Sequence, residues 1–307
     1  MYKIEFAPLQ GYTDAIYRTV HNKVFGGINC YYSPFIRLEK GKVRQKDIKD
    51  IFPENNENIN LVPQIIVNSK EEFLKLTESV SNLGYKRIDI NMGCPFPLQT
   101  KKGRGAALLQ KAKHLEDIVE SINSINDIDF SIKMRLGMNS AEETKEALEI
   151  INIAKLHHLT IHPRIARQQY KGEIDYKTFD YIYQNCLHPI IYNGDILSQE
   201  DIYNIINNYP NIEGIMIGRG LLAKPYLAME FNKNIRLSVS ERLSMIMKLH
   251  DAIYDYYSSV MQGEHQLLLT MKTFWEYLNE EIGKKPYKAI KKSANIKKYE
   301  LAIRLVG

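Results

Sequence analysis

The feature that most constrains the fold of this chain is an alternation of short β-rich runs with helical stretches over its first three quarters. Eight runs have the length and composition of strands, and they span residues 4–7, 30–35, 61–67, 87–91, 130–134, 159–162, 189–193 and 214–217. Amphipathic segments lie between them, among them 70–83, 116–125, 141–156 and 198–208. Such alternation is typical of βαβ units and a parallel sheet. The count of eight favours an α/β fold of the (β/α)8 TIM-barrel type, and an open doubly wound sheet is the alternative if one strand is misassigned.

The pattern changes after residue 237. Three helices with apolar residues at three- and four-residue spacing, and no strand between them, are predicted over 240–260, 265–281 and 286–305. A barrel commonly occupies about 250 residues as one unit. We therefore expect two domains, which are a catalytic barrel over residues 1–237 and a C-terminal helical domain over residues 238–307.

Apolar runs and cysteines indicate the compartment. No stretch of about 18 apolar residues is present, so no membrane-spanning helix is expected. The first eight residues have no apolar signal core. The cysteines, Cys30, Cys94 and Cys186, are odd in number, far apart and without a CxxC pair, which argues against a disulfide framework or a zinc site. We expect a cytoplasmic protein with no metal and no membrane association. A monomer is expected, although the sequence does not determine the oligomeric state.

Polar residues follow the predicted strands, at the end where such barrels carry their active sites. The fourth strand runs into Asn91-Met92-Gly93-Cys94-Pro95, where a thiol between a Gly and a Pro is placed for chemistry, although most free cysteines are small buried hydrophobes. Lys133 and Arg135 alternate to one face of the fifth strand. Burying an unpaired lysine is costly, which favours a functional lysine over a structural one. The third and sixth strands supply Gln64 and His162, and a core histidine is the simpler interpretation of His162 taken alone.

The loops after the seventh and eighth strands carry Asn193-Gly194-Asp195 and Gly218-Arg219-Gly220. These two loops commonly form a phosphate site in a barrel, because glycines let backbone N–H groups approach and an arginine adds a bidentate charge. Either glycine loop alone could be a tight turn. Together they favour a phosphate-bearing ligand.

The formal net charge of +5 is mild, but residues 284–298 contain seven lysines and no acidic residue. A lysine run is often only a solvated helix face. A polyanionic partner such as a phosphate backbone is the alternative.

The chain resembles the tRNA-dihydrouridine synthase family, flavin-dependent enzymes with a barrel and a C-terminal helical domain, and it is most similar to their bacterial branch. The matching segments occur in the family's order and are APLQGYTDAIYR (7–18), DINMGCPFPLQTKKGRGAALL (89–109), IKMRLG (132–137), IHPRIARQQYKGEIDY (161–176), YNGDI (192–196) and GIMIGRGLLAKPYL (214–227). The resemblance is most specific around residues 89–109 and weaker in the helical domain.

The resemblance implies an FMN-dependent, NADPH-driven reduction of the C5–C6 double bond of specific uridines in tRNA. Hydride would pass from flavin N5 to C6, and Cys94 would donate the proton to C5. A neutral thiol suits that role because its unperturbed pKa lies near about 8.5. The uridine must leave its stack to reach the flavin.

The resemblance also assigns residues. The FMN ring would be contacted by Pro8, Leu9, Gln64, Lys133 and His162, and the phosphate by Asn193, Gly194, Asp195, Gly218 and Arg219. The base would be oriented by Asn91 and Arg135, with Tyr170 packing against the substrate. The body of the tRNA would meet Lys101, Lys102 and Arg104 after Cys94, and Lys288, Lys291 and Lys292 near the C-terminus, so the lysine run is interpreted as RNA-facing.

One segment departs from the family pattern. Family members usually carry His-Gly-Arg-Thr where this chain has His162-Pro163-Arg164-Ile165. A proline has no backbone N–H, so a flavin contact through that group would be lost. His162 is kept as a flavin ligand.

Two other functions are alternatives. A barrel flavoenzyme that reduces a small molecule, such as a dihydroorotate-type or other ene reductase, shares the phosphate loops but does not account for the lysine-rich helical domain. An RNA-binding module that has lost catalysis conflicts with the intact Cys94, Lys133, His162 and Arg219. The sequence does not say which uridine is modified, whether rRNA is a substrate, or whether NADPH or NADH is preferred.

Overall fold

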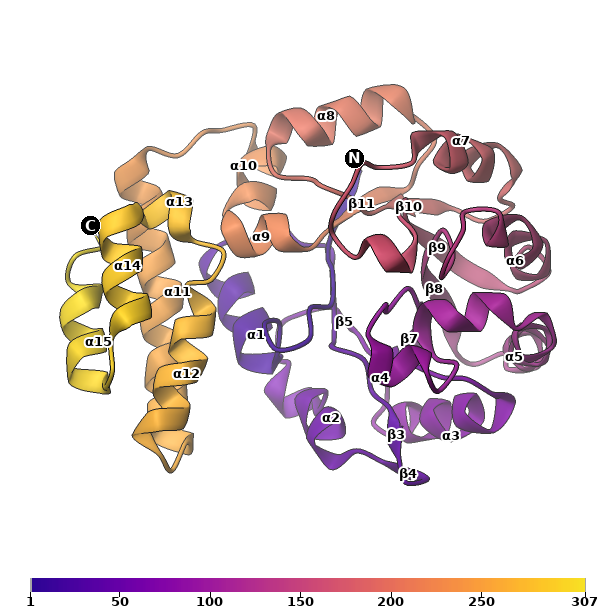
Figure 1. Cartoon of the computed structure of the whole chain (residues 1–307), viewed down its shortest axis with the longest axis horizontal. Helices are drawn as coiled ribbons and strands as arrows, with labels where there is room; N and C mark the ends of the chain where they lie inside the picture. Colours follow the sequence, from indigo (N-terminus) through magenta and orange to yellow (C-terminus); the bar gives the residue numbers. More distant parts are fainter. Residues whose placement is uncertain (1, 307) are drawn as a thin grey trace.

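The computed structural model describes residues 2–306 and contains a parallel β-barrel surrounded by helices, followed by a bundle of helices (Figure 1). The barrel sheet has the order β5-β2-β1-β11-β10-β9-β8-β7-β6, and every pairing in it is parallel. Its strands are β1 (Lys3–Phe6), β2 (Cys30–Tyr32), β5 (Leu61–Val62), β6 (Gln64–Ile65), β7 (Arg87–Met92), β8 (Asp129–Arg135), β9 (Leu156–His162), β10 (Ile190–Tyr192) and β11 (Gly214–Ile217). The expected fold class is confirmed.

The nine strands occupy eight positions in the barrel. β5 and β6 are two halves of the third predicted strand, interrupted at Pro63. Proline has no N–H to donate to a ladder, which explains the break. β5 pairs with β2 and β6 pairs with β7, so the interrupted strand closes the ring.

Helices follow the strands around the barrel. They are α1 (Ala15–Val24), α2 (Gln45–Asp50), α3 (Lys70–Ser81), α4 (Pro97–Thr100), α5 (Ala112–Ser124), α6 (Glu143–Ile151), α7 (Tyr176–Asn185), α8 (Gln199–Asn208), α9 (Arg219–Ala223) and α10 (Leu227–Lys233), with a small hairpin of β3 (Leu38–Glu39) and β4 (Lys42–Val43). Side chains cap several of them, and Asp14 accepts a hydrogen bond from the Tyr17 N–H at the start of α1. The helix predicted over 141–156 was too long, because Leu156 already begins β9.

The helical domain contains five helices instead of the three predicted. They are α11 (Val239–Val260), α12 (Glu264–Phe274), α13 (Asn279–Ile282), α14 (Lys284–Lys292) and α15 (Ile296–Ile303). The first prediction matches α11, and each of the other two covers a pair of helices. A turn at residues 275–278 separates α12 from α13, and residues 293–295 separate α14 from α15, which the Asn295 side chain caps by accepting from the Lys298 N–H. Apolar spacing continues across both breaks, and periodicity alone therefore joined the pairs.

Aromatic residues form the centre of this bundle. Trp275 is fully buried and donates from Nε1 to the Tyr299 hydroxyl at 2.8 Å, and His250 Nε2 lies 2.7 Å from the same hydroxyl. The bundle contacts the barrel through α1, where the Tyr257 hydroxyl donates to Asp14. The domain boundary expected at residues 237/238 falls between α10 and α11, and it stays a prediction.

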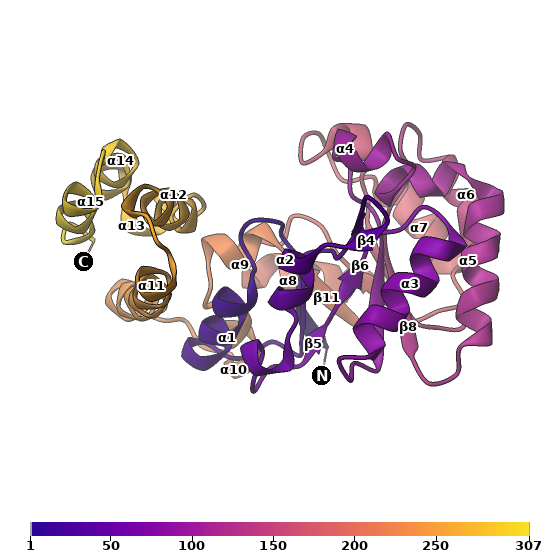
Figure 2. The same ribbon diagram turned by 90° about the horizontal axis from the view of Figure 1, so that it is seen from below.

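Figure 2 shows which elements share the side of the barrel mouth. Helix α4 follows β7 and marks the mouth, while the N-terminal end of β1 lies on the opposite side. Helices α12 and α14 lie toward the same side as α4. Within residues 2–306, no helix combines the length and apolar character required to cross a bilayer.

Candidate active site

A cavity of about 480 Å³ opens at the carboxyl ends of the barrel strands. This volume is in the range of small-molecule and cofactor sites. Its lining contains every predicted catalytic and flavin-contacting residue and three predicted substrate residues: Cys94; Pro8, Leu9, Gln64, Lys133, His162, Asn193, Gly194, Asp195, Gly218 and Arg219; and Asn91, Arg135 and Tyr170. The structure thus brings these side chains together, and their individual roles stay predictions. Sequence reasoning missed other lining residues, including Phe35 and Tyr277, the latter from the helical domain.

The Cys94 turn is held from two sides. Its N–H donates to Asn91 Oδ1 at 2.8 Å, and the Gly93 N–H donates to the same oxygen at 3.1 Å. On the other side, the Ala106 N–H donates to the Cys94 carbonyl at 3.2 Å. Gly105 has φ +62°, and a Cβ there would lie 2.6 Å from that carbonyl oxygen, so only glycine fits. The thiol therefore has a defined place beside the cavity.

The thiol is neutral at pH 7. Burial raises the pKa of Cys94 above its ordinary value, and the smaller opposing effects of the Phe96 backbone and of Arg135 and Arg37 do not cancel it. Arg37 is a charged neighbour that the sequence reasoning did not assign to the site. A raised thiol pKa is a property of a proton donor and not of an activated nucleophile.

A chain of buried side-chain hydrogen bonds ends at the Cys94 turn. Asn91 Nδ2 donates to Gln64 Oε1 at 2.8 Å, and Gln64 Nε2 donates to Asp89 Oδ2 at 2.6 Å. The second Asp89 oxygen accepts from the Ser131 hydroxyl at 2.7 Å. The parallel register of β6 on β7 places Gln64 opposite Asp89, which explains the contact.

Lys133 carries a charge that can respond to a ligand. Its ammonium donates to Asn193 Oδ1 at 2.6 Å and, within the described residues, forms no ion pair. It is partly accessible from the cavity, and burial lowers its pKa to about 7, with a further lowering by Arg135 and an opposing effect of Asp89. An electron-rich ligand edge beside it would favour the charged form.

His162 has a buried ring nitrogen that lacks a partner. Burial and then the neighbouring cations, with Arg135 first, hold the pKa of His162 well below its ordinary value, so the ring is neutral. Its Nε2 atom makes no hydrogen bond among the described residues. Leaving a buried polar atom unsatisfied is costly, and a ligand atom in the cavity would supply the missing bond.

The predicted phosphate loops contain an unexpected carboxylate arrangement. Asp195 accepts from Arg219 Nη2 at 3.0 Å and from Arg164 Nη1 at 2.9 Å. The hydrogen bond from Arg164 is the largest cause of the lowered pKa of Asp195. Arg164 is thus a buried support for the loop, a role that the sequence did not reveal. The Asp195 carboxylate is itself anionic, and this residue could contact a phosphate only through its backbone.

Tyr170 lies across the cavity mouth as a half-exposed ring. The Arg219 guanidinium lies over it at 4.1 Å from the ring centroid, and the Arg135 guanidinium at 5.4 Å. Its ring centroid is 6.3 Å from that of His162. Such cation–π contacts hold the ring in reach of anything bound in the cavity.

The predicted RNA-facing residues lie outside the cavity and divide into two groups. Lys101, Lys102 and the whole run of seven lysines at 284–298 are exposed, and no residue of that run forms an ion pair within residues 2–306. Arg104 is different, because it is buried and paired with Glu72. Its burial contradicts an RNA-facing position, and we leave Arg104 out of the proposed surface.

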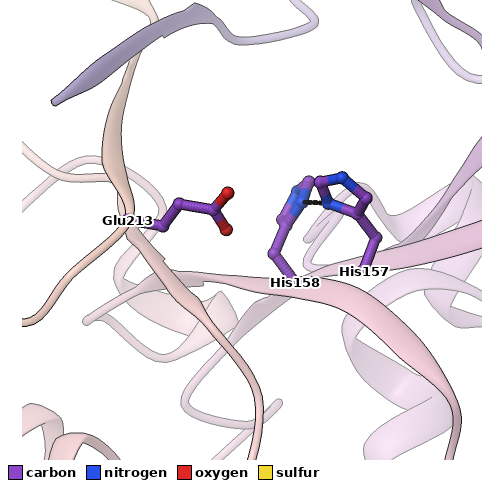
Figure 3. A group of neighbouring side chains, drawn as sticks. All are labelled: His157, His158 and Glu213. Atoms are coloured by element: carbon purple, nitrogen blue, oxygen red, sulfur yellow. Dashed lines mark hydrogen bonds between the residues drawn. The ribbon is translucent and has the colours of Figure 1, made fainter. Parts of the chain in front are cut away.

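One group of potential metal donors occurs among residues 2–306, at the end of the barrel opposite the mouth. Donor atoms of His157, His158 and Glu213 lie within 4.8 Å of one another, as Figure 3 shows. Glu213 is already paired with Lys3, and Arg87 Nη2 lies 3.5 Å from His157 Nδ1. Two permanent cations beside these donors disfavour a third, and we assign no metal to the group.

Solved structures with this fold provide the first comparison. The old yellow enzyme from Trypanosoma cruzi has a TM-score of 0.52 at 11% identity, over 77% of this chain and 89% of that one. A morphinone reductase in complex with tetrahydroNAD has a TM-score of 0.54 at 11% identity, over 78% and 90% of the two chains. At this identity the likeness supports the barrel fold alone.

Sequence comparisons identify the family. The protein-family model described as Dihydrouridine synthase (Dus) matches residues 5–305 of this chain. The tRNA-dihydrouridine synthase B of Shewanella oneidensis is 31% identical over 205 residues, which are 63% of this chain and 61% of that protein. The tRNA-dihydrouridine synthase B of Pasteurella multocida is 28% identical over 270 residues, or 83% and 78% of the two chains. The family match runs over nearly the whole chain, through both the barrel and the helices, and the chain therefore belongs to the dihydrouridine synthase family.

Proposed function

We propose that this protein, an oxidoreductase of the dihydrouridine synthase family, reduces specific uridines in tRNA at the C5–C6 bond, with FMN as its flavin and NADPH as its reductant. The observation that carries the proposal is the neutral Cys94 thiol in the same cavity lining as Lys133 and His162. The cofactor type follows from the family, and the choice of FMN and NADPH is part of the proposal.

The residues present fit a flavin. The unpartnered His162 Nε2 and the ammonium of Lys133 would meet polar atoms of the ring, while Pro8 and Leu9 supply apolar surface. The backbone of the Gly194 and Gly218 loops, together with Arg219, would hold the phosphate. When bound, the flavin supplies hydride for C6 of the uracil ring.

Cys94 supplies the proton for C5. Its raised pKa keeps the proton on sulfur until the substrate requires it, and Arg135 and Arg37 stabilise the thiolate left behind. Asn91 and Arg135 line the same wall and would orient the base. Solvent protons then restore the thiol.

The RNA would bind across two exposed basic surfaces. Lys101 and Lys102 lie in the loop after α4 at the mouth, and the lysine run begins in α14 on the same side of the molecule (Figure 2). Exposed ammonium groups without acidic partners release counterions when they meet phosphates, which favours binding at low salt. A small-molecule ene reductase has no need of such a surface. A cytoplasmic, monomeric enzyme without metal is part of the same proposal.

The test is to map dihydrouridine in RNA from cells with and without this protein, and in tRNA incubated with the purified protein, FMN and NADPH. We expect defined uridine positions to lose dihydrouridine in the cells that lack the protein and to gain it in vitro. A protein that oxidises NADPH and reduces activated alkenes, yet leaves tRNA unmodified and unbound at low salt, would support the small-molecule enzyme instead.

A further inference from the structure

Asp89 is a buried carboxylate at the far end of the hydrogen-bond chain that reaches Cys94. It lies within β7 with no exposed surface, and it does not line the cavity. Burying a carboxylate is costly, and two strong donors, Gln64 and Ser131, offset part of that cost. A pure packing role would be filled better by an apolar residue.

The chain of hydrogen bonds from Asp89 to Cys94 has one allowed donor-to-acceptor direction. An ionised carboxylate only accepts hydrogen bonds, so Gln64 must present its Nε2 to Asp89 and its Oε1 to Asn91. Asn91 then presents Nδ2 to Gln64 and Oδ1 to the backbone N–H groups of Gly93 and Cys94. Backbone N–H groups only donate. Both ends therefore require the same orientation of the two amides, which side-chain geometry alone would leave ambiguous.

We propose that Asp89 is a positioning residue, which fixes the orientation of the Gln64 and Asn91 amides and thereby holds the Cys94 turn, and with it the proton donor, in place. This inference rests on the proposed function of Cys94. Protonation of Asp89 would remove the constraint at one end and leave only the backbone N–H groups to orient the amides. A protonated carboxyl can donate to Gln64 Oε1, so a reversed arrangement of both amides can compete. In that arrangement Asn91 Nδ2, a donor, would face the Gly93 and Cys94 N–H groups and leave them without an acceptor, which loosens the turn.

The groups around Asp89 set the pH at which its carboxylate is protonated. Burial raises its pKa to about 6, and the bonds from Gln64 and Ser131 and the charges of Lys133 and Arg87 oppose this. Glu5 and Tyr32 also face it from β1 and β2. Since the pKa is raised, the carboxylate is present above about pH 6 and is lost as the pH falls through that value. Uridine reduction should therefore decline on the acid side near pH 6.

Three variants separate positioning from packing. D89N keeps the shape of Asp89 but can donate to Gln64 as well as accept from it, as the protonated carboxyl can, so it should hold uridine reduction near the lowered level that the wild type shows below about pH 6 and lose the acid decline. D89L removes the acceptor and should lower single-turnover reduction of tRNA by pre-reduced enzyme about 10- to 100-fold, the value of a hydrogen bond to a charged group. S131A should leave the plateau unchanged and move the acid decline to higher pH, because the carboxylate loses one donor.

A second readout does not depend on the reaction. The rate of Cys94 alkylation by iodoacetamide, followed by peptide mass spectrometry, should change severalfold in D89L and less in D89N, with flavin retention as the check on folding. If the wild-type protein forms dihydrouridine and D89L matches it in turnover and alkylation, the positioning role is refuted. A D89N variant that matches the wild type while D89L alone loses activity also refutes it, because the loss would then come from packing. If the wild type forms no dihydrouridine, the proposed function fails, and the alkylation arm still tests Asp89.

Discussion

The barrel mouth and the lysine-rich surface of the helical domain are both basic, but they hold their charges in different ways. The cations that line the cavity at the mouth are buried or half-buried, and each is positioned by specific contacts, such as Lys133 to Asn193 or Arg219 to Asp195. On the surface, seven lysines are exposed and, within the described residues, unpaired. The first arrangement suits a reaction that requires fixed atoms. The second suits a polyanion recognised by summed charge.

This difference predicts how each region responds to substitution. At the mouth, one atom can decide the reaction, because its neighbours are placed around it. On the surface, each lysine contributes a small and similar amount, and salt screens all of them together.

Cys94→Ala should give the largest effect. Loss of a general acid costs about 10²- to 10⁴-fold, so dihydrouridine formation should fall by at least about 10²-fold. Flavin content and tRNA affinity should not change, because the variant removes only the thiol. Single-turnover assays measure dihydrouridine formation, and filter binding measures tRNA affinity. Cys186→Ala, half-buried outside the cavity, is the matched control. If Cys94→Ala formed dihydrouridine at the wild-type rate, Cys94 would not be the proton donor.

Arg219→Ala tests the phosphate loops. Removing a charge-assisted hydrogen bond, worth about 1.5–3 kcal/mol, should weaken FMN binding by roughly 10- to 100-fold. Riboflavin, which lacks the phosphate, should bind the variant and the wild type about equally. Fluorescence titration of the apoprotein with both ligands measures this. Equal losses for FMN and riboflavin would mean that Arg219 supports the cavity through Asp195 and Tyr170 and does not contact the phosphate.

Replacing Lys288, Lys291 and Lys292 together with Gln tests the surface. Each lost phosphate contact reduces the steepness of log affinity against log salt by about 0.7–0.9. The magnitude of the slope should therefore decrease by about two, and binding becomes less sensitive to salt. We expect roughly tenfold weaker tRNA binding at moderate salt and unchanged NADPH oxidation. The control is the same change at Lys113, Lys145 and Lys177, which are exposed on barrel helices away from the helical domain. Equal effects of the two triple variants would mean that the C-terminal lysines form only a solvated helix face and do not bind the RNA specifically.

Tyr277→Ala should give the smallest effect, at the point where the two regions meet. The ring comes from the helical domain, lines the cavity and packs edge-on against Tyr12 at 5.3 Å. An aromatic pair contributes about 0.5–1.5 kcal/mol, so kcat/KM for tRNA should fall about two- to tenfold. NADPH oxidation should not change. A loss of NADPH oxidation would assign Tyr277 to the flavin instead of to the domain contact.

The sequence by itself determined which of the proposed catalytic and flavin-contacting residues gather around the cavity. Barrel topology brings successive strand ends to one mouth, so a residue's place after a strand was enough to group Gln64, Cys94, Lys133, His162 and Arg219. The same periodicity located the strands to within a few residues, and the family motifs supported the order. These features are local or follow from chain order alone.

Only the tertiary structure decided which side chains are partners. Arg104 pairs with Glu72, 32 residues away, and is buried, although its position after Cys94 suggested an RNA contact. Arg164 supports Asp195 across a comparable distance, and Asp89 reaches Cys94 through two amides. Partner choice depends on burial and on the packing of separate strands, and no local pattern encodes these. For the same reason, the sequence could not show that His162 Nε2 has no hydrogen-bond partner among residues 2–306.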